Sequence, residues 1–317
     1  MELALSEEQQ ELAATVRSLL AKRADPRVET YDEALWQTLC EQIGVAALAV
    51  PEEHDGFGAS LFETCVVLEE LGRSLAPSPL LSSLVTAEAL LAGADEDAKQ
   101  RLLPRIAAGE VAAFADGDEA VLDGDLAAIV IAATDDGLYE VEDAETSWLP
   151  TMDQTIRLAT VTGGTRTRIG DGPSARDRAR LVGAAGCAAL ATGLSARALE
   201  MTVAYSQERV QFGRPIGSFQ ALKHRMADML VLAEMSRSVS WAASYALAVD
   251  SDDAEQLVHA AKSYCCEALS HIAGETVQLH GGIAITWEHD AQLVFKRAHA
   301  LGQLFGAPRA HRALVAP

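Results

Sequence analysis

The sequence predicts a mainly α-helical protein with a small β region in its middle. Hydrophobic residues make up 49% of the 317 residues while aromatic residues make up only 5%, and long stretches rich in Ala, Leu, Glu and Arg favour helices over a β-sandwich. Short β-favouring runs gather in one part of the chain. We therefore expect an N-terminal helical domain at residues 1–108, a small antiparallel β domain at 109–174 and a four-helix bundle at 175–317.

The first helix is expected to begin after Ser6, because Ser6 and Gln9 have the spacing of a capping box. Leu12, Val16 and Leu20 then lie on one face. Pro, His, Asp and Gly crowd together in residues 51–58 and predict a loop. Further helices are expected at 35–43, from about 60 to 75, and at 80–106 with a break near Gly93.

The β region is expected to consist of short strands joined by tight turns. Residues 127–132 and 137–141 favour strands, and Asp-Gly pairs begin at Asp116, Asp123, Asp136 and Asp171. About 65 residues are few for an independent domain. We therefore expect this region to pack against the helices on both sides.

Helical periodicity returns after Pro173 in four segments. Breaks at residues 213–215, 250–253 and 281–282 separate these segments. Short connections between long helices predict an antiparallel bundle. The second segment carries an expected apolar stripe of Phe219, Leu222, Met226, Met229, Leu230 and Ala233.

Charge and composition exclude several classes of protein. The 46 acidic and 25 basic residues give a net charge of −21, which would repel a nucleic-acid backbone. No stretch approaches about 20 uninterrupted apolar residues, and Met1 to Leu3 lack the basic start of a signal peptide. We expect no nucleic-acid partner, no membrane association and a cytoplasmic protein.

The five cysteines favour reduced core thiols rather than a disulfide framework or a zinc site. Their number is odd, and CxxC spacing is absent. A nucleophilic Cys187 is the alternative, but nothing near it in the sequence would lower its pKa.

The segment from Tyr205 to Gln220 is a candidate anion site. A helix is expected to end near Arg209, a turn contains Phe212 and Gly213, and Ser218 is expected to cap the next helix. The guanidinium of Arg209 and free N–H groups at a helix start suit a nucleotide diphosphate. An ordinary helix–turn–helix connection with a solvated arginine is the alternative.

A second candidate segment reads Gln278-Leu279-His280-Gly281-Gly282. Paired glycines permit close approach of a ligand or a second chain to the backbone. A simple glycine helix cap explains the same residues without a ligand, and His280 has no obvious catalytic partner.

Together the two segments resemble the acyl-CoA dehydrogenase family, in which an Arg-x-x-Phe-Gly turn with a Gln eleven residues after the Arg precedes Gln-x-x-Gly-Gly. The resemblance continues at residues 50–53, 56–58 and 286–290 and at Arg297. It implies a helical domain, a β domain that is shortened here, and a four-helix bundle. It also implies an acyl-CoA substrate, an electron-transfer flavoprotein as acceptor, and FAD at a subunit interface. The implied FAD contacts are Arg209, Phe212, Gly213, Gln220, Gln278, Leu279, His280, Gly281 and Gly282.

The family's catalytic base is missing at both of its usual places. Phe305 stands where most members have Glu, and Gly183 stands at the alternative position on the first bundle helix, followed by Ala184. Arg178 and Arg180 lie nearby but are not bases. Residues 114–125 replace the loop that normally supports the flavin ring, without matching it. The chain therefore has no assigned catalytic residue.

Three hypotheses follow from this pattern. The chain is a dehydrogenase subunit that contributes FAD contacts to a homologous partner carrying the base. Alternatively it is a self-sufficient homo-oligomeric enzyme with an unrecognised base, for which Glu288 and Asp290 are the nearest carboxylates to the glycine pair. The third hypothesis is a non-enzymatic scaffold on the same fold.

Overall fold

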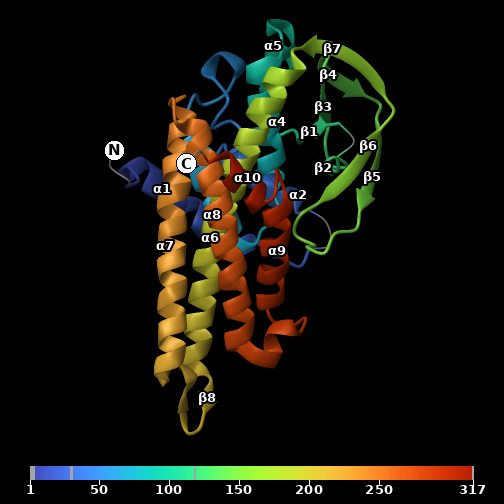
Figure 1. Cartoon of the computed structure of the whole chain (residues 1–317). Helices are drawn as coiled ribbons and strands as arrows, with labels where there is room; N and C mark the ends of the chain where they lie inside the picture. Colours follow the sequence, from blue (N-terminus) through green and yellow to red (C-terminus); the bar gives the residue numbers. More distant parts are fainter. Residues whose placement is uncertain (1–3, 29–30, 118, 316–317) are drawn as a thin grey trace.

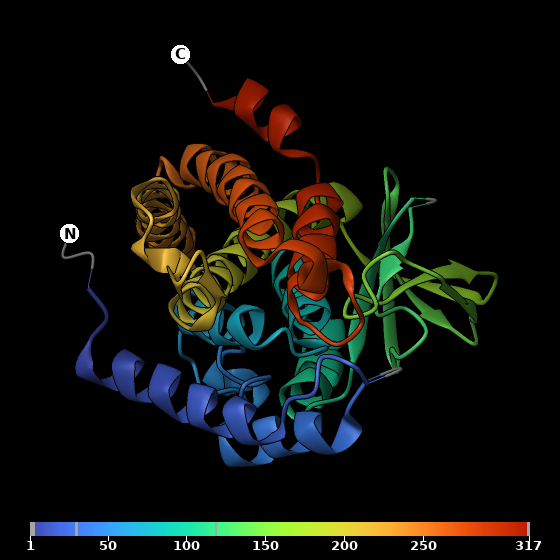
Figure 2. The ribbon, with the colours of Figure 1, turned by 90° about the horizontal axis from the view of Figure 1, so that it is seen from below.

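The computed structural model describes residues 4–28, 31–117 and 119–315, so Met1 to Leu3 lie outside the described residues. The predicted fold class is confirmed: long helices form a tall column, and the strands lie to one side of its upper half (Figure 1). The N-terminal helices lie along one flank of the bundle, as the view from below shows (Figure 2).

The N-terminal helices begin at well-defined polar caps. Ser6 Oγ accepts a hydrogen bond from the Gln9 N–H and the Gln9 side chain accepts one from the Ser6 N–H, so the predicted capping box is present. Ser60 and Glu63 form a second capping box. The elements are α1 (Glu7–Arg23), α2 (Glu33–Gln42), the 3-10 turn η1 (Glu52–His54), α3 (Leu61–Ser74), α4 (Leu80–Gly93) and α5 (Glu96–Ala107).

The β region contains two small sheets rather than one antiparallel sheet. One sheet has the order β1-β3-β4-β7 and the other β2-β6-β5. The strands are β1 (Ala112–Asp116), β2 (Val121–Leu122), β3 (Ile129–Thr134), β4 (Gly137–Glu142), β5 (Glu145–Leu149), β6 (Leu158–Thr162) and β7 (Thr165–Gly170).

The prediction of an antiparallel region was wrong for one pair of strands. β1 and β3 run parallel, with Ala112 opposite Ile129. Between them the chain leaves the first sheet to form β2 in the second, and this crossover returns β3 in the same direction as β1. The other pairs in both sheets are antiparallel.

One of the four predicted Asp-Gly turns is a helix start. Asp136 lies in the two-residue loop of the β3–β4 hairpin, where Thr134 pairs with Gly137. Asp171 instead caps the first bundle helix, because its carboxylate accepts a hydrogen bond from the Ser174 N–H at 3.0 Å. The expected boundary at residue 174 therefore falls in the first turn of this helix.

Four long helices and one short one form the bundle, with α6 the most enclosed. They are α6 (Gly172–Glu208), α7 (Gln220–Ala248), α8 (Ala254–His280), α9 (Ala291–Gln303) and α10 (Pro308–Leu314), with the 3-10 turns η2 (Ile216–Ser218) and η3 (Gly281–Ile285) between them. Within the described ranges, α6 alone is long and apolar enough to cross a membrane, but 89% of its most apolar stretch is buried inside the protein, as in a core helix.

Two details of α7 differ from the prediction. Phe219, not Ser218, is the residue before its first turn, and the Ser218 hydroxyl donates to the Pro215 carbonyl instead. Of the expected apolar stripe, Met229 and Ala233 are buried whereas Leu230 is exposed. α7 therefore turns part of its apolar surface away from the core of this chain.

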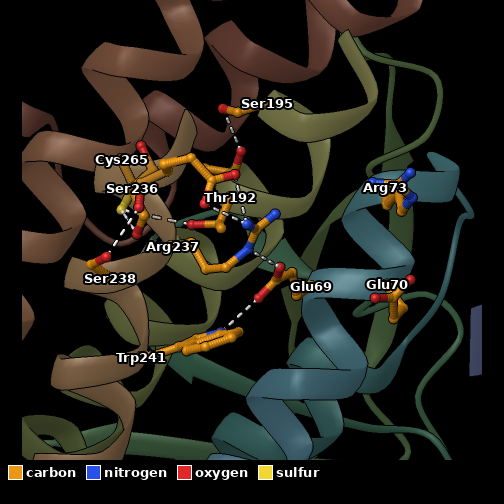
Figure 3. A network of polar contacts seen from close by, with 12 residues as sticks. Glu69, Glu70, Arg73, Thr192, Ser195, Ser236, Arg237, Ser238, Trp241 and Cys265 are labelled. Atoms are coloured by element: carbon orange, nitrogen blue, oxygen red, sulfur yellow. Dashed lines mark hydrogen bonds and ion pairs between the residues drawn. The ribbon is translucent and has the colours of Figure 1, made fainter. Parts of the chain in front are cut away.

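A half-buried carboxylate joins the N-terminal helices to the bundle. Glu69 on α3 accepts hydrogen bonds from Trp241 Nε1 at 2.8 Å and from Arg237 Nε at 3.4 Å, both on α7 (Figure 3). Burial raises the pKa of Glu69, while its contacts with Trp241 and Arg237 oppose that rise. These contacts hold α3 against α7.

Candidate flavin-contact site and base position

A short hairpin at the end of α6 presents an aromatic ring to solvent. β8 (Val210–Gln211) pairs with β9 (Arg214–Pro215), leaving Phe212 and Gly213 as a two-residue turn. Both have positive φ, 52° and 77° respectively, as a type I′ turn requires. The left-handed region is unfavourable for phenylalanine, yet Phe212 is 93% exposed. Packing within this chain therefore does not explain why a phenylalanine occupies this turn.

Arg209 marks the junction between α6 and this hairpin. Its backbone N–H donates to the Tyr205 carbonyl, and its carbonyl accepts from the Ile216 N–H at 2.8 Å. Across the described residues, its guanidinium has no carboxylate within ion-pair distance. Gln220, the first residue of α7, is also exposed. Both side chains are free to bind another molecule.

The second segment lies at the same end of the bundle. Gln278, Leu279 and His280 are the last residues of α8, and Gly281 ends the helix with φ 65°. Thr202 of α6 donates to Thr276 of α8 at 3.1 Å. The His280 ring stacks on Tyr205 with centroids 4.5 Å apart. The fold thus brings together the two segments that the sequence separates by about 60 residues.

His280 is a neutral structural residue in this arrangement. Its Nδ1–H donates to the Thr276 carbonyl at 2.7 Å, and burial lowers the pKa of its ring. The interpretation of His280 as structural is therefore supported. Gly281 and Gly282 by contrast face open space, because a Cβ added at either one would meet nothing within 4 Å.

These residues fit the pyrophosphate end of a dinucleotide. Arg209 supplies a cation without a carboxylate partner, and the open glycines permit close approach to the backbone. Phe212 offers an exposed ring. The β8–β9 hairpin lies at the lower end of the bundle (Figure 1), and Arg209 and Phe212 are exposed there.

Gly183 and Phe305, the residues at the two positions where the resemblance places a base, come together in space, and the Phe305 ring fills the space over Gly183. A Cβ added to Gly183 would lie 2.3 Å from Cδ1 of Phe305. Phe305 has φ 53°, and its carbonyl accepts a hydrogen bond from His311 Nε2 at 2.8 Å. Phenylalanine and glycine carry no group that accepts a proton.

Buried polar groups hold the turn that carries Phe305. His311 Nδ1 lies 2.9 Å from His259 Nδ1, and the ammonium of the fully buried Lys262 donates to the Leu301 carbonyl near the end of α9. Since His311 Nε2 donates to a carbonyl, neutral His311 accepts from His259 at Nδ1. Burial lowers the pKa of His311, which favours this neutral form.

A cavity of about 830 Å³ adjoins Phe305, between the β region, the start of α6 and α10. Asp116 on its wall binds Arg176 at 2.8 Å and Arg180 at 2.7 Å. Arg178 pairs with Glu88 on α4 at 2.7 Å. The arginines near the alternative base position are thus held by carboxylates of this chain.

Two domain models describe most of the sequence. Residues 6–110 match the acyl-CoA dehydrogenase N-terminal domain, and residues 170–317 match the acyl-CoA dehydrogenase C-terminal domain. The chain is also 44% identical to the acyl-CoA dehydrogenase IpdE2 of Mycolicibacterium smegmatis, over 96% of each protein. The chain belongs to the acyl-CoA dehydrogenase family.

Solved structures share the whole fold of this member of the family. The Tcur3481-Tcur3483 steroid ACAD has a TM-score of 0.85 at 28% identity, covering 98% of this chain and 96% of that one. The ChsE4-ChsE5 complex from Mycobacterium tuberculosis has a TM-score of 0.87 at 24% identity, covering 99% and 98%. The similarity to the ChsE4-ChsE5 complex shows a shared fold alone.

The carboxylates considered as substitutes for the dehydrogenase base lie far from Phe305. Asp290 immediately precedes α9 and pairs with Arg27 at 2.6 Å, and Glu288 is exposed. Phe305 follows the other end of α9. Thirteen residues of helix span about 20 Å, so neither carboxylate shares a site with the Phe305 position.

The thiol of Cys187 is equally unsuited to nucleophilic chemistry. Burial raises the pKa of Cys187 to about 12, and all five cysteines are free. The reading of Cys187 as a core thiol agrees with this environment.

The sequence did not single out Asp123 or the partner of Arg297. Asp123 was interpreted as a turn residue, yet its carboxyl is buried. Arg297 Nε donates to Asp153 at 2.8 Å, and both are buried, which ties α9 to the loop between β5 and β6. No spacing in the sequence pairs residues 144 positions apart.

Proposed function

We propose that this chain is a subunit of a heteromeric, flavin-dependent acyl-CoA dehydrogenase. It contributes contacts to FAD through Arg209, Phe212, Gly213, Gln220 and the segment 278–282. A homologous partner subunit carries the catalytic base and binds the acyl-CoA. The assembly desaturates the acyl group between its α and β carbons and passes electrons to an electron-transfer flavoprotein in the cytoplasm.

The observation that carries this proposal is the contact between Phe305 and Gly183. Desaturation requires a base beside the α-carbon, and both family positions for it are occupied here by a ring packed on a glycine. Reintroducing a side chain at position 183 is blocked by that ring. The chain's own base site is therefore closed to the chemistry, whereas its outward flavin contacts are kept.

The geometry of the outward contacts supports a role across an interface. Phe212 holds a strained conformation without burying its ring, and strain of this kind is a sign of function. Part of the apolar surface of α7, including Leu230, Val231 and Met235, is also exposed. The ChsE4-ChsE5 complex, which has the same fold, joins two named chains.

Within such an assembly the bound FAD supplies the hydride acceptor. Arg209 neutralises negative charge on the pyrophosphate, and the backbone at Gly281 and Gly282 permits its close approach. These residues position the cofactor. The proton is removed by the partner.

Co-expression with candidate partner subunits tests the proposal. The chain is purified alone and with each partner, and flavin absorbance and acyl-CoA-dependent dye reduction are measured. We expect stoichiometric flavin and activity only in a mixed complex. Stoichiometric flavin with full activity in the isolated chain would refute the partner requirement and support a self-sufficient enzyme.

A matched pair of substitutions tests which chain carries the base. In the active complex, Phe305→Glu is expected to leave activity unchanged, because this chain's site is not used, whereas the amide substitution of the partner's base abolishes it. A mixed complex that assembles without flavin and without dehydrogenase activity would instead support a non-enzymatic scaffold.

A further inference from the structure

One titratable side chain anchors the short helix α10 to the rest of the protein. α10 lies at the outer edge of the bundle, beside α8 (Figure 2). Of its residues, all of which the structure describes, His311 alone is buried. A helix of seven residues is held by tertiary contacts rather than by helix propensity. The position of α10 therefore depends on His311.

Both ring nitrogens of His311 are held by other parts of the chain. Nε2 donates to the Phe305 carbonyl at 2.8 Å, and Nδ1 lies 2.9 Å from Nδ1 of His259 on α8. The turn after α9 packs closely on the ring, because a Cβ added to Gly306 would lie 2.8 Å from His311 Nε2. His311 thus ties α10 both to α8 and to the turn that carries Phe305.

This arrangement requires a neutral His311. A ring that donates from Nε2 accepts at Nδ1 only while Nδ1 carries no proton. His259 donates from its Nδ1 in either charge state, and the Glu255 carboxylate faces its Nε2 at 3.6 Å. When His311 takes a proton on Nδ1, two N–H groups face each other across 2.9 Å and the hydrogen bond between the rings is lost.

The surroundings of His311 oppose a positive charge on its ring. Burial lowers the pKa of His311, and the neighbouring His259 and Lys262 of α8 lower it further, whereas the hydrogen bond to the carbonyl of the turn raises it. Arg312 of α10 pairs with Glu267 of α8. Across the adjoining cavity, the charged or titratable groups are Asp116 on β1, Glu119, Arg180 on α6 and His299 on α9. Among the described residues, no carboxylate lies within ion-pair distance of the His311 ring.

α10 also forms one wall of the cavity of about 830 Å³ beside Phe305. Ala310, His311 and Leu314 line this cavity from α10, and the β region and the start of α6 line it from the other side. The residue that anchors the helix is thus itself part of the cavity wall. The protonation of His311 therefore bears on whether this wall stays in place.

We propose that α10 is a pH-sensitive strap over this cavity, docked while His311 is neutral and released when His311 takes a proton. Protonation removes the hydrogen bond with His259 and leaves a buried charge without a partner, which is costly. Release carries the ring into water and opens the cavity on its α10 side. This inference does not depend on the proposed dehydrogenase function, because it concerns the chain alone and no catalytic step.

Hydrogen exchange of α10 at two pH values tests the strap. Exchange of the backbone amides of residues 305–315 is followed by mass spectrometry in the full chain at about pH 7.5 and about pH 5.5, with correction for the intrinsic exchange rate at each pH. The pKa of His311 is 6.5 in a solvated helix and lower in the docked one, so docking weakens as pH falls through 6.5. We expect the protection of α10 to fall about tenfold at the lower pH, as one proton allows, while α6 and α8 keep theirs. Equal protection of α10 at both pH values would overturn the proposal.

Two substitutions at His311 assign the response to this ring. His311→Gln keeps a side chain that donates and accepts hydrogen bonds, His311→Leu keeps a buried anchor, and neither takes a proton. Where α10 docks in either variant, its protection should be the same at both pH values. An α10 that is unprotected at both pH values in both variants would also support the strap, because the imidazole is then what holds the helix.

His271→Gln is the matched control, since it removes an exposed histidine of α8. This variant should keep the wild-type response of α10 to pH. A response that persists in either His311 variant, or that disappears in His271→Gln, would contradict the assignment to His311.

Discussion

At the scale of single residues, Phe305 and Gly183 form one packed contact. The Phe305 ring fits there only because residue 183 lacks a side chain, and the resemblance places the family's base at these two positions. The two positions form one unit although 122 residues separate them. A carboxylate side chain at either position would require the residue at the other position to move or be replaced.

The first prediction concerns this pair. Gly183→Ala should lower the free energy of unfolding by about 1–3 kcal/mol, because the new Cβ would lie 2.3 Å from the Phe305 ring. Adding Phe305→Ala should remove most of this penalty by making room for the methyl group. Urea unfolding of both single variants and the double variant measures the coupling. Additive effects would mean that the two residues do not share one space.

The second prediction concerns the pH dependence of stability at Asp123. Its pKa is raised by burial to about 7 in the folded state, from 3.8. Between these values the folded protein holds a proton that the unfolded chain has lost, so stability falls as pH rises from about 4 to about 7. The contribution is at most about 1.4 kcal/mol per pH unit.

Asp123→Asn is the matched control, since it remains neutral throughout. The free energy of unfolding of the wild type minus that of Asp123→Asn should decrease with pH across this window and then become constant. A difference that is flat or that increases with pH would show that Asp123 is ionised in the folded protein.

At the scale of elements, the β8–β9 hairpin has a turn conformation that packing within this chain does not require. Phe212 is in the left-handed region, and its ring has only an edge contact with Phe219, at a centroid distance of 6.2 Å. The turn type demands positive φ at this position, where glycine or asparagine is normally found. Contacts among the described residues therefore do not account for this conformation.

The third prediction follows from this strain. Phe212→Gly should raise the free energy of unfolding of the isolated chain by about 0.5–1 kcal/mol, because glycine adopts φ 52° without a steric penalty. In the mixed complex the same variant should retain less flavin. Gly213→Ala is the opposing control and should destabilise the isolated chain by about 1–2 kcal/mol. An isolated Phe212→Gly chain that is less stable than wild type would exclude backbone strain.

At the scale of the whole molecule, the proposed flavin contacts and Phe305 lie toward opposite ends of α9. Arg209 and the 278–282 segment gather at one end of the bundle, whereas Phe305 follows the other end of that helix. This separation is consistent with the proposal that an unlike partner chain carries the base.

The fourth prediction tests the outward end. In the assembled complex, Arg209→Ala should weaken flavin binding about 10- to 100-fold, the loss of a charge-assisted contact, without changing the thermal stability of the isolated chain. Arg309→Ala, an exposed arginine on α10, is the control and should have no effect. Flavin released by unfolding and quantified by absorbance gives the stoichiometry. Unchanged flavin content in Arg209→Ala would favour the scaffold hypothesis.

Much of this protein was determined by its sequence alone. Helix periodicity and capping residues such as Ser6 are local signals, so they predicted the helical class and most breaks between helices. The resemblance of Arg209-x-x-Phe212-Gly213 and Gln278-x-x-Gly281-Gly282 to flavin-contact segments also came from the sequence, because it rests on fixed spacings. Flavin binding by these residues stays a prediction.

Only the tertiary structure decided which distant residues act together. The parallel pairing of β1 with β3, the contact of Phe305 with Gly183 and the burial of Asp123 beside Ser82 all join segments between 17 and 122 residues apart. Such contacts follow from packing, which depends on the whole core rather than on neighbours along the chain. For the same reason an Asp-Gly pair at Asp171 became a helix cap, and the one at Asp123 placed a carboxyl inside the protein.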